Sequence, residues 1–103
     1  MGEKRGLFIT FEGPEGGGKT TQARRLISRL QNTGHKVTYT REPGGTRTGE
    51  AIREILQHDK TGEALNHRAE VYLFAASRSQ LCDQVILPAI ERGEVVISDR
   101  FID

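Results

Sequence analysis

The feature that most limits what this chain can fold into is a glycine cluster that follows a short apolar stretch. Residues 13–20 read Gly-Pro-Glu-Gly-Gly-Gly-Lys-Thr, which matches the phosphate-loop pattern of Gly, four residues, then Gly-Lys-Ser/Thr. The glycines of such a loop turn backbone N–H groups inward around an anion, and the helix that follows points its positive end at the same charge. The loop therefore requires a strand before it and a helix after it.

Both flanking elements are predicted by the residue pattern. Residues 6–12 are short, β-branched and aromatic, which indicates a strand that stops at the glycines. From Lys19 the apolar residues recur three and four positions apart, as on one face of a helix that Gly34 would end. They are Ala23, Leu26, Ile27 and Leu30. These flanking patterns make an incidental glycine turn a poor alternative.

The rest of the chain continues the alternation of strands and helices. Residues 36–41 predict a second strand, and Thr48 predicts the cap of a helix that runs to about Gln57. The residues expected to face inward on that helix are Ala51, Ile52, Ile55 and Leu56.

A long helix is predicted to follow, with Asn66 as its N-cap, a kink at Pro88 and an end at Gly93. Its expected apolar face is made by Val71, Phe74, Ala75, Leu81, Val85 and Ile86. Residues 94–99 then predict a nearly apolar third strand of the kind buried on both faces of a parallel sheet. The order is that of a three-layered α/β protein with a parallel sheet.

Composition excludes several other classes of protein. The 103 residues form one domain at most, and the formal net charge of +1 provides no general field for nucleic acid or anionic lipid. No apolar run approaches the length of a membrane span. The single cysteine, Cys82, cannot form an internal disulfide. We therefore expect no nucleic-acid or membrane partner and a reduced, cytoplasmic setting.

Three residues predict the chemistry of a nucleotide site. Lys19 would reach the β- and γ-phosphate oxygens, and Thr20 would be a ligand of Mg²⁺. Asp99 ends the third strand, where nucleotide-binding folds place an acidic residue near the metal. Taken alone, Asp99 could equally cap the next turn. The Asn-Lys-x-Asp guanine-reading motif is absent from the sequence, which argues against a GTP switch.

Four segments together resemble bacterial thymidylate kinase. They are residues 11–22 with the phosphate loop, 40–46 (Thr-Arg-Glu-Pro-Gly-Gly-Thr), 73–78 (Leu-Phe-Ala-Ala-Ser-Arg) and 98–100 (Ser-Asp-Arg). The loop alone is shared by many kinases and ATPases, whereas the second and third segments are specific to this family. The resemblance implies the three-layer fold of P-loop nucleoside monophosphate kinases. It also implies transfer of a phosphoryl group from ATP, with Mg²⁺, to thymidine 5′-monophosphate (dTMP).

The resemblance also implies a role for individual residues. Catalytic residues would be Lys19, Arg100, Asp99 and Glu15. ATP phosphates would be bound by Gly13, Pro14, Glu15, Gly16, Gly17, Gly18, Lys19, Thr20 and Thr21. Mg²⁺, partly through water, would be held by Thr20 and Asp99. The dTMP site would be built by Glu15, Arg41, Glu42, Pro43, Arg53, Phe74, Arg78 and Arg100.

Within the implied dTMP site, Arg53 and Arg100 resemble the ligands of the acceptor phosphate, and Arg41 resembles the arginine that supports them. Phe74 resembles the ring stacked on thymine, and Arg78, one helical turn later, resembles the donor to a base carbonyl. Glu15 resembles the acid that holds the sugar 3′-hydroxyl.

Simpler interpretations of these residues remain open. From periodicity alone Phe74 is as well explained as a core residue, and Arg53 or Arg78 as solvated helix surface. Another P-loop nucleoside monophosphate kinase, or a fragment that binds nucleotide without turnover, would also carry the phosphate loop.

The sequence departs from the family pattern in two respects. Phe101 stands where the family usually has tyrosine after the Asp-Arg pair, so a hydroxyl is lost there. Residues 1–103 also resemble only the amino-terminal part of one kinase domain, without the lid and carboxyl-terminal part. Residues 13–20 contain no arginine, so we expect the catalytic cation to come from that lid. We further expect a bare edge on the loop-bearing strand and, for the full-length form, a homodimer.

Overall fold

The computed structural model describes residues 5–14, 18–58 and 61–101. The strands are β1 (Leu7–Gly13), β2 (Val37–Glu42) and β3 (Val95–Phe101). The helices are α1 (Lys19–Asn32), α2 (Arg47–His58), α3 (His67–Leu81) and α4 (Leu87–Glu91), with a π-helical turn, η1 (Cys82–Ile86), between α3 and α4. Their order confirms the predicted alternation of strands and helices. None of the described helices is long and apolar enough to cross a membrane.

The three strands form one parallel sheet in the order β1-β3-β2. β3 is the last strand in the sequence but lies in the middle, with Val95 opposite both Leu7 of β1 and Val37 of β2. Because the strands are parallel, their carboxyl ends meet at one edge of the sheet. That edge carries Gly13, Glu42 and Arg100, which belong to three of the four segments that carry the family resemblance.

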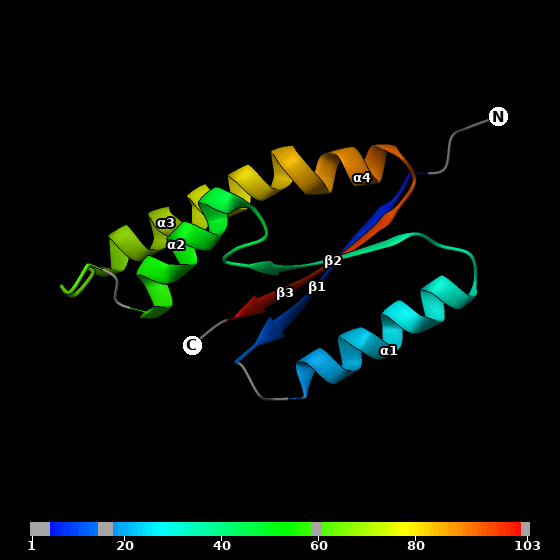
Figure 1. Ribbon diagram of the computed structural model, residues 1–103, viewed down its shortest axis with the longest axis horizontal. Coiled ribbons are helices and arrows are strands. Elements are labelled where there is room, and N and C mark those ends of the chain that lie inside the picture. Colours follow the sequence, from blue (N-terminus) through cyan, green and yellow to red (C-terminus); the bar gives the residue numbers. More distant parts are fainter. Residues whose placement is uncertain (1–4, 15–17, 59–60, 102–103) are drawn as a thin grey trace.

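Helices cover both faces of the sheet, which gives the expected three layers (Figure 1). α1 lies on one face, where Ala23 packs with Val95 and Ile97. On the other face Leu81, Ile86 and Ala89 pack against Val96, and α2 packs on α3. The alternation of side chains along β3 therefore divides residues 95–100 between the two layers of helices.

The cap of α2 differs from the prediction. Thr46, not Thr48, accepts the hydrogen bond of a first-turn N–H group, since its Oγ1 lies 2.9 Å from the Gly49 nitrogen. Gly45, with a φ of 84°, turns the chain just before this residue, so the helix begins at Arg47. Ala51, expected to face inward, is exposed, whereas Ile52 is buried.

The long predicted helix is divided into three parts. Asn66 does cap α3, with its Oδ1 2.8 Å from the Ala69 nitrogen. Pro88 has no N–H and its ring crowds the preceding turn, and the π-helical turn η1 ends just before it. Val71 and Ala75 were predicted to lie on the apolar face, but both are exposed. The prediction assumed a single α-helical period for the whole segment, and η1 interrupts that period.

Candidate functional site

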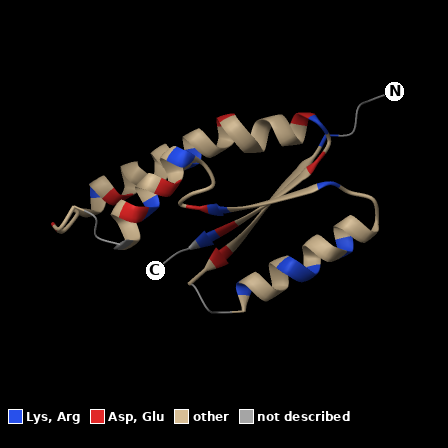
Figure 2. Cartoon of the chain, in the orientation of Figure 1, with Lys and Arg blue, Asp and Glu red and all other residues tan. Residues whose placement is uncertain are grey.

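The start of α1 is built to face an anion. Gly18 precedes the helix with a φ of 79°, a left-handed conformation that favours glycine, and as the N-cap residue it has no side chain to cap the first turn. The N-cap residue therefore supplies no side-chain acceptor to the first N–H groups of the helix. α1 also carries basic but no acidic residues, as Figure 2 shows. The backbone dipole and the charge of Lys19 thus favour a negative ligand at the start of α1.

Lys19 and Thr20 converge on Asp99 of the neighbouring strand β3. The Lys19 Nζ lies 2.5 Å from the Asp99 Oδ1, and the Thr20 hydroxyl donates to the Asp99 Oδ2 at 3.3 Å. Lys19 and Asp99 are both buried. The predicted nucleotide residues, which are about 80 positions apart in the sequence, are therefore brought together by the pairing of β1 with β3.

A residue that sequence reasoning missed completes this cluster. The hydroxyl of Tyr39, on β2, donates to the Asp99 Oδ2 at 2.6 Å. Burial raises the pKa of Asp99, but contact with the Lys19 ammonium and with the Tyr39 hydroxyl outweighs burial and holds that pKa below its usual value. Burial and the Asp99 carboxylate both raise the pKa of Tyr39. Asp99 is therefore an anion and Tyr39 a neutral donor at physiological pH.

The donor set at Asp99 fits the magnesium ion that the phosphate loop implies. Mg²⁺ prefers oxygen ligands and is usually held by one or two protein groups plus phosphate oxygens and water. The Thr20 hydroxyl and the Asp99 carboxylate are two such oxygen groups in contact with each other. The Asp99 Oδ1 is buried and, apart from its ion pair with Lys19, accepts no hydrogen bond from the described residues. In the part of the chain that the structure describes, no group of three or more His, Cys, Asp or Glu side chains gathers as a metal site.

A cavity opens beside this cluster. Its volume is about 470 Å³, and it reaches from Asp99 and Thr20 past Tyr39 to the turn between β2 and α2. On that side it is bordered by Arg41, Gly45 and Glu50. The Arg41 guanidinium and the Glu50 carboxylate form an ion pair there. Arg41 thus lies at the end of β2, where the family resemblance predicts a supporting arginine.

On the opposite face of the sheet, Glu42 organises a second cluster. Its carboxylate is buried and accepts hydrogen bonds from two nitrogens of Arg78, on α3, and from the Ser98 hydroxyl at 2.7 Å. The Arg78 guanidinium also lies 5.3 Å from the centre of the Phe8 ring. Glu42 was expected at the dTMP site. In the structure its carboxylate contacts the Arg78 guanidinium and fixes its position.

The turn after Glu42 is shaped by close contacts. The Glu42–Pro43 peptide is cis, and the Gly44 nitrogen donates to the Ser77 hydroxyl at 3.0 Å. A side chain at Gly45 would place its Cβ 2.3 Å from the Thr40 hydroxyl oxygen, so this position requires glycine. The turn also holds Arg53, which is buried and donates to the Pro43 carbonyl at 3.0 Å.

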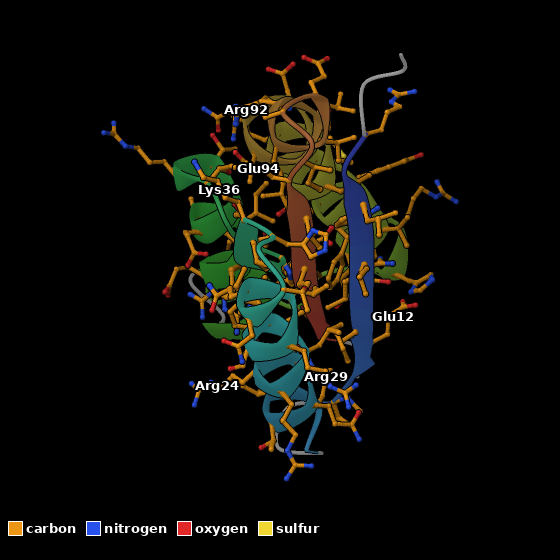
Figure 3. All side chains as sticks on the ribbon, turned by 90° about the vertical axis from the view of Figure 1, so that its right-hand side faces the viewer. Glu12, Arg24, Arg29, Lys36, Arg92 and Glu94 are labelled. Carbon is orange, nitrogen blue, oxygen red and sulfur yellow. The ribbon has the colours of Figure 1, made fainter. Side chains whose placement is uncertain are left out.

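Two further predicted dTMP residues lie on this face. Arg100 follows the alternation of β3 to the side of Ser98 and forms an ion pair with Glu12, its neighbour across the sheet, at 3.2 Å. Phe74 is half-buried on α3, one turn before Arg78. In the side view of Figure 3, Glu12 lies near the carboxyl end of β1, and Arg24 and Arg29 project from α1 in front of the sheet.

With the exception of Arg41, which borders the cavity beside Asp99, the predicted residues form two groups that the sheet separates. The described nucleotide residues lie at the α1 end, where Pro14 and Thr21 are exposed, and the other described dTMP residues lie on the α3 face. Glu15, Gly16 and Gly17 lie outside the described residues. Sequence reasoning missed Tyr39, Ser98, Ser77 and Phe8. For Tyr39 and Ser98 the missing information was strand order, which decides the residues each one faces across the sheet.

Known proteins match this chain along nearly all of its sequence. The sequence profile of the family described as thymidylate kinase matches residues 11–103. The chain is 54% identical over 100 residues to the thymidylate kinase of Bifidobacterium longum strain DJO10A, covering 95% of this chain and 48% of the relative. It is also 54% identical over 99 residues to the thymidylate kinase of Gluconobacter oxydans, covering 96% of this chain and 45% of the relative.

The crystal structure of thymidylate kinase from Ehrlichia chaffeensis has the same arrangement of elements, with a TM-score of 0.81 and 37% sequence identity. The match covers 94% of this chain and 54% of that structure. The chain thus spans about half the length of the curated relatives it matches. The profile match over residues 11–103 and these relatives show that the chain belongs to the thymidylate kinase family.

Proposed function

We propose that the protein transfers the γ-phosphoryl group of ATP to dTMP, giving ADP and dTDP. The observation that carries this proposal is the convergence of Lys19 and Thr20 on Asp99, at the edge of the sheet where Arg100 also emerges. The phosphate-binding start of α1 and the Asp99 carboxylate lie on one face of the sheet, and the cationic side chain of Arg100 lies at the same edge on the other face. Phosphoryl transfer needs this combination, because two polyanions must be held together.

On the donor side, the N–H groups at the start of α1 and the Lys19 ammonium bind the phosphates of ATP. The segment from Gly13 to Thr21 surrounds them. Lys19 exchanges its ion pair with Asp99 for a phosphate oxygen, so its positive charge stays buried and paired throughout. Thr20 and Asp99 would hold Mg²⁺, which when bound would neutralise phosphate charge.

On the acceptor side, no general base is needed, because the nucleophile is already a phosphate oxygen of dTMP. That oxygen forms a bond to the γ-phosphorus, while the bond from the γ-phosphorus to the bridging oxygen breaks and ADP leaves. Arg100 and Arg53 bind the acceptor phosphate, for which a planar guanidinium can grip two oxygens. Arg41 supports this region, and Glu15 holds the sugar 3′-hydroxyl.

The base is bound by Phe74 and Arg78, with Glu42 and Pro43 supporting them. Glu42 occupies the Nε and Nη2 atoms of Arg78, while the Nη1 atom makes no hydrogen bond with the described residues. The Arg78 side chain is 34% exposed. A fixed, partly exposed N–H group of this kind suits recognition of a base carbonyl, and the Phe74 ring one turn away suits stacking.

The proposal extends to the organisation of the protein. Residues 1–103 form the amino-terminal part of one kinase domain, with the phosphate loop at residues 13–20. We assign the lid and the carboxyl-terminal part of that domain to the portion of the relatives that this chain does not span, since the chain covers 48% of the B. longum relative. The catalytic cation is then supplied by the lid, since residues 13–20 contain no arginine.

The homodimer and the cytoplasmic setting implied by the family resemblance are part of the same proposal. Sedimentation of the chimera described in the next paragraph tests whether the protein forms a dimer.

The deciding experiment measures dTMP-dependent release of ADP from ATP and Mg²⁺. It compares the 103-residue chain with a chimera that appends the carboxyl-terminal half of the B. longum relative. We expect turnover by the chimera and none by the chain alone. ADP binding without turnover by both proteins would favour a non-catalytic nucleotide-binding fragment. A preference for UMP, CMP or AMP over dTMP would favour another nucleoside monophosphate kinase.

Two variants of the chimera test the assigned residues. Lys19→Ala removes the cation that binds the phosphates, so turnover should be abolished. Phe74→Ala removes stacking worth about 1–3 kcal/mol and should mainly raise the KM for dTMP. An unchanged KM for Phe74→Ala would show that Phe74 is a core residue. Tyr72→Phe, on an exposed part of the same helix, is the control and should leave both constants unchanged.

A further inference from the structure

Tyr39 occupies a distinctive position relative to the acidic residue of the site. It lies on β2 opposite Ile97, two residues before Asp99, so Tyr39 and Asp99 point to the same face of the sheet. Its hydroxyl reaches forward along that face to the Asp99 Oδ2 at 2.6 Å. The Tyr39 side chain is 41% exposed, whereas Asp99 is buried. The hydroxyl is therefore the part of Tyr39 that enters the site.

The partners of Asp99 differ in whether they are also expected to bind the nucleotide or its metal ion. The Oδ1 faces Lys19, and the Oδ2 accepts from Thr20 at 3.3 Å as well as from Tyr39. Lys19 and Thr20 belong to the phosphate loop and are the groups that the proposed function assigns to phosphate and metal. Nucleotide binding therefore competes with both of their contacts to Asp99. The Tyr39 bond comes from the sheet and is not subject to that competition.

A carboxylate needs such an anchor, because the last torsion of an aspartate side chain has a broad energy profile. We propose that Tyr39 is a positioning residue for Asp99, whose hydroxyl fixes the carboxylate when Lys19 and Thr20 turn to the nucleotide. This inference rests on the proposed function. Outer-shell partners of metal-binding side chains have large effects on metal affinity, and Tyr39 holds such a place relative to Thr20 and Asp99.

The test separates binding of the nucleotide from its enhancement by the metal. Calorimetry measures ADP affinity of the 103-residue chain with and without Mg²⁺, for wild type, Tyr39→Phe and the control Tyr72→Phe. Tyr72 is the only other tyrosine, is 67% exposed and lies on α3. We expect Tyr39→Phe to bind metal-free ADP as the wild type does. Its gain in affinity on adding Mg²⁺ should be smaller by about tenfold, the lower end of the range for outer-shell partners.

The outcomes distinguish this inference from the proposed function. An equal Mg²⁺ gain in wild type and Tyr39→Phe would overturn the role of Tyr39 and leave the proposed function intact. Failure of the wild type to bind ADP with Mg²⁺ would overturn the proposed function, and the inference would fall with it. Equal weakening of ADP binding with and without Mg²⁺ in Tyr39→Phe would also overturn the inference, because a general structural defect acts on both.

A second measurement needs no change at Tyr39. The chain has no tryptophan, so Tyr72→Phe leaves Tyr39 as its only tyrosine and makes tyrosine emission a direct probe of this residue. Emission from a tyrosine whose hydroxyl donates to a carboxylate is quenched. We expect the quenched emission to persist when ADP and Mg²⁺ bind. A rise to the level of the Asp99→Asn form of the same variant would show that the bond breaks and would overturn the proposal.

Discussion

Arg41 and Glu50 join the end of β2 to the first turn of α2. The Arg41 Nη2 lies 2.5 Å from the Glu50 Oε1, and the Gly45 nitrogen donates to the Glu50 Oε2 at 2.9 Å. The hydrogen bond from Arg41 is the largest cause that holds the pKa of Glu50 below its ordinary value of 4.5. Both side chains of the pair are nearly half exposed, so solvent screens the interaction.

This lowered pKa predicts a pH-dependent contribution to stability. A carboxyl group with a depressed folded-state pKa stabilises the fold above its ordinary pKa, and the contribution is lost as the pH falls through the folded-state value. Glu50→Gln should therefore lower the free energy of unfolding by at most about 1 kcal/mol at neutral pH. The difference from wild type should vanish as the pH falls below 4.5. Urea unfolding of both proteins over this range measures it.

Glu54→Gln is the matched control, since Glu54 is exposed on the same helix and forms no ion pair with a described residue. A wild-type advantage over Glu50→Gln that stayed constant down to acid pH would contradict the role of the charge. Such a result would assign the advantage to the second acceptor oxygen of Glu50, which receives the hydrogen bond from the Gly45 nitrogen and which an amide lacks.

The residues of the site were predictable to different degrees. Lys19, Thr20 and Asp99 follow from a motif and a strand end, and the structure does bring them together. The buried state of Glu42 was not predictable, because it depends on Arg78 arriving from a helix 36 positions away. The contact of Tyr39 with Asp99 could not be predicted, because aromatic residues are common in strands and the neighbouring strand was not known.

At the scale of elements, the ends of the strands were predicted to within about two residues. The segment 67–91 was predicted as one helix, whereas it consists of α3, η1 and α4. β-branched runs ended by glycine or a charged residue give clear boundaries, as in residues 94–99 against Val95–Phe101. In the later segment, Leu81 and Ile86 are five positions apart yet pack into one core cluster. Such a spacing does not return to one face of an α-helix, but it suits the wider π-helical turn that contains Ile86.

This explanation of η1 predicts the effect of removing one residue. Deletion of the exposed Gln84 should convert η1 to an α-helical turn and keep Leu81 and Ile86 on one face. The free energy of unfolding should change by less than about 1 kcal/mol. Deletion of the exposed Arg25 in α1 is the control. It rotates Leu26, Ile27 and Leu30 away from the sheet and should cost about 3 kcal/mol or more. Urea unfolding followed by circular dichroism compares the two, and equal losses would contradict the argument.

At the scale of the whole molecule, β1 exposes one edge. It pairs with β3 on one side, and no other strand among the described residues pairs with its second edge. Leu7, at its start, is 60% exposed. The sequence predicted this edge through the family resemblance, in which the loop-bearing strand is central. An unpaired strand edge beside an exposed apolar side chain is a site of self-association.

A charge at this edge should therefore oppose self-association of the chain. Leu7→Lys should raise the concentration at which the chain associates by roughly tenfold, because burying a leucine contributes about 1.5–3 kcal/mol. Leu87→Lys is the matched control, since Leu87 is 53% exposed and lies on helix α4 rather than on β1. Light scattering over a concentration series measures both variants. If Leu87→Lys suppressed association and Leu7→Lys did not, the self-association contact would lie on the layer of helices that carries Leu87. The edge of β1 would then not be the contact.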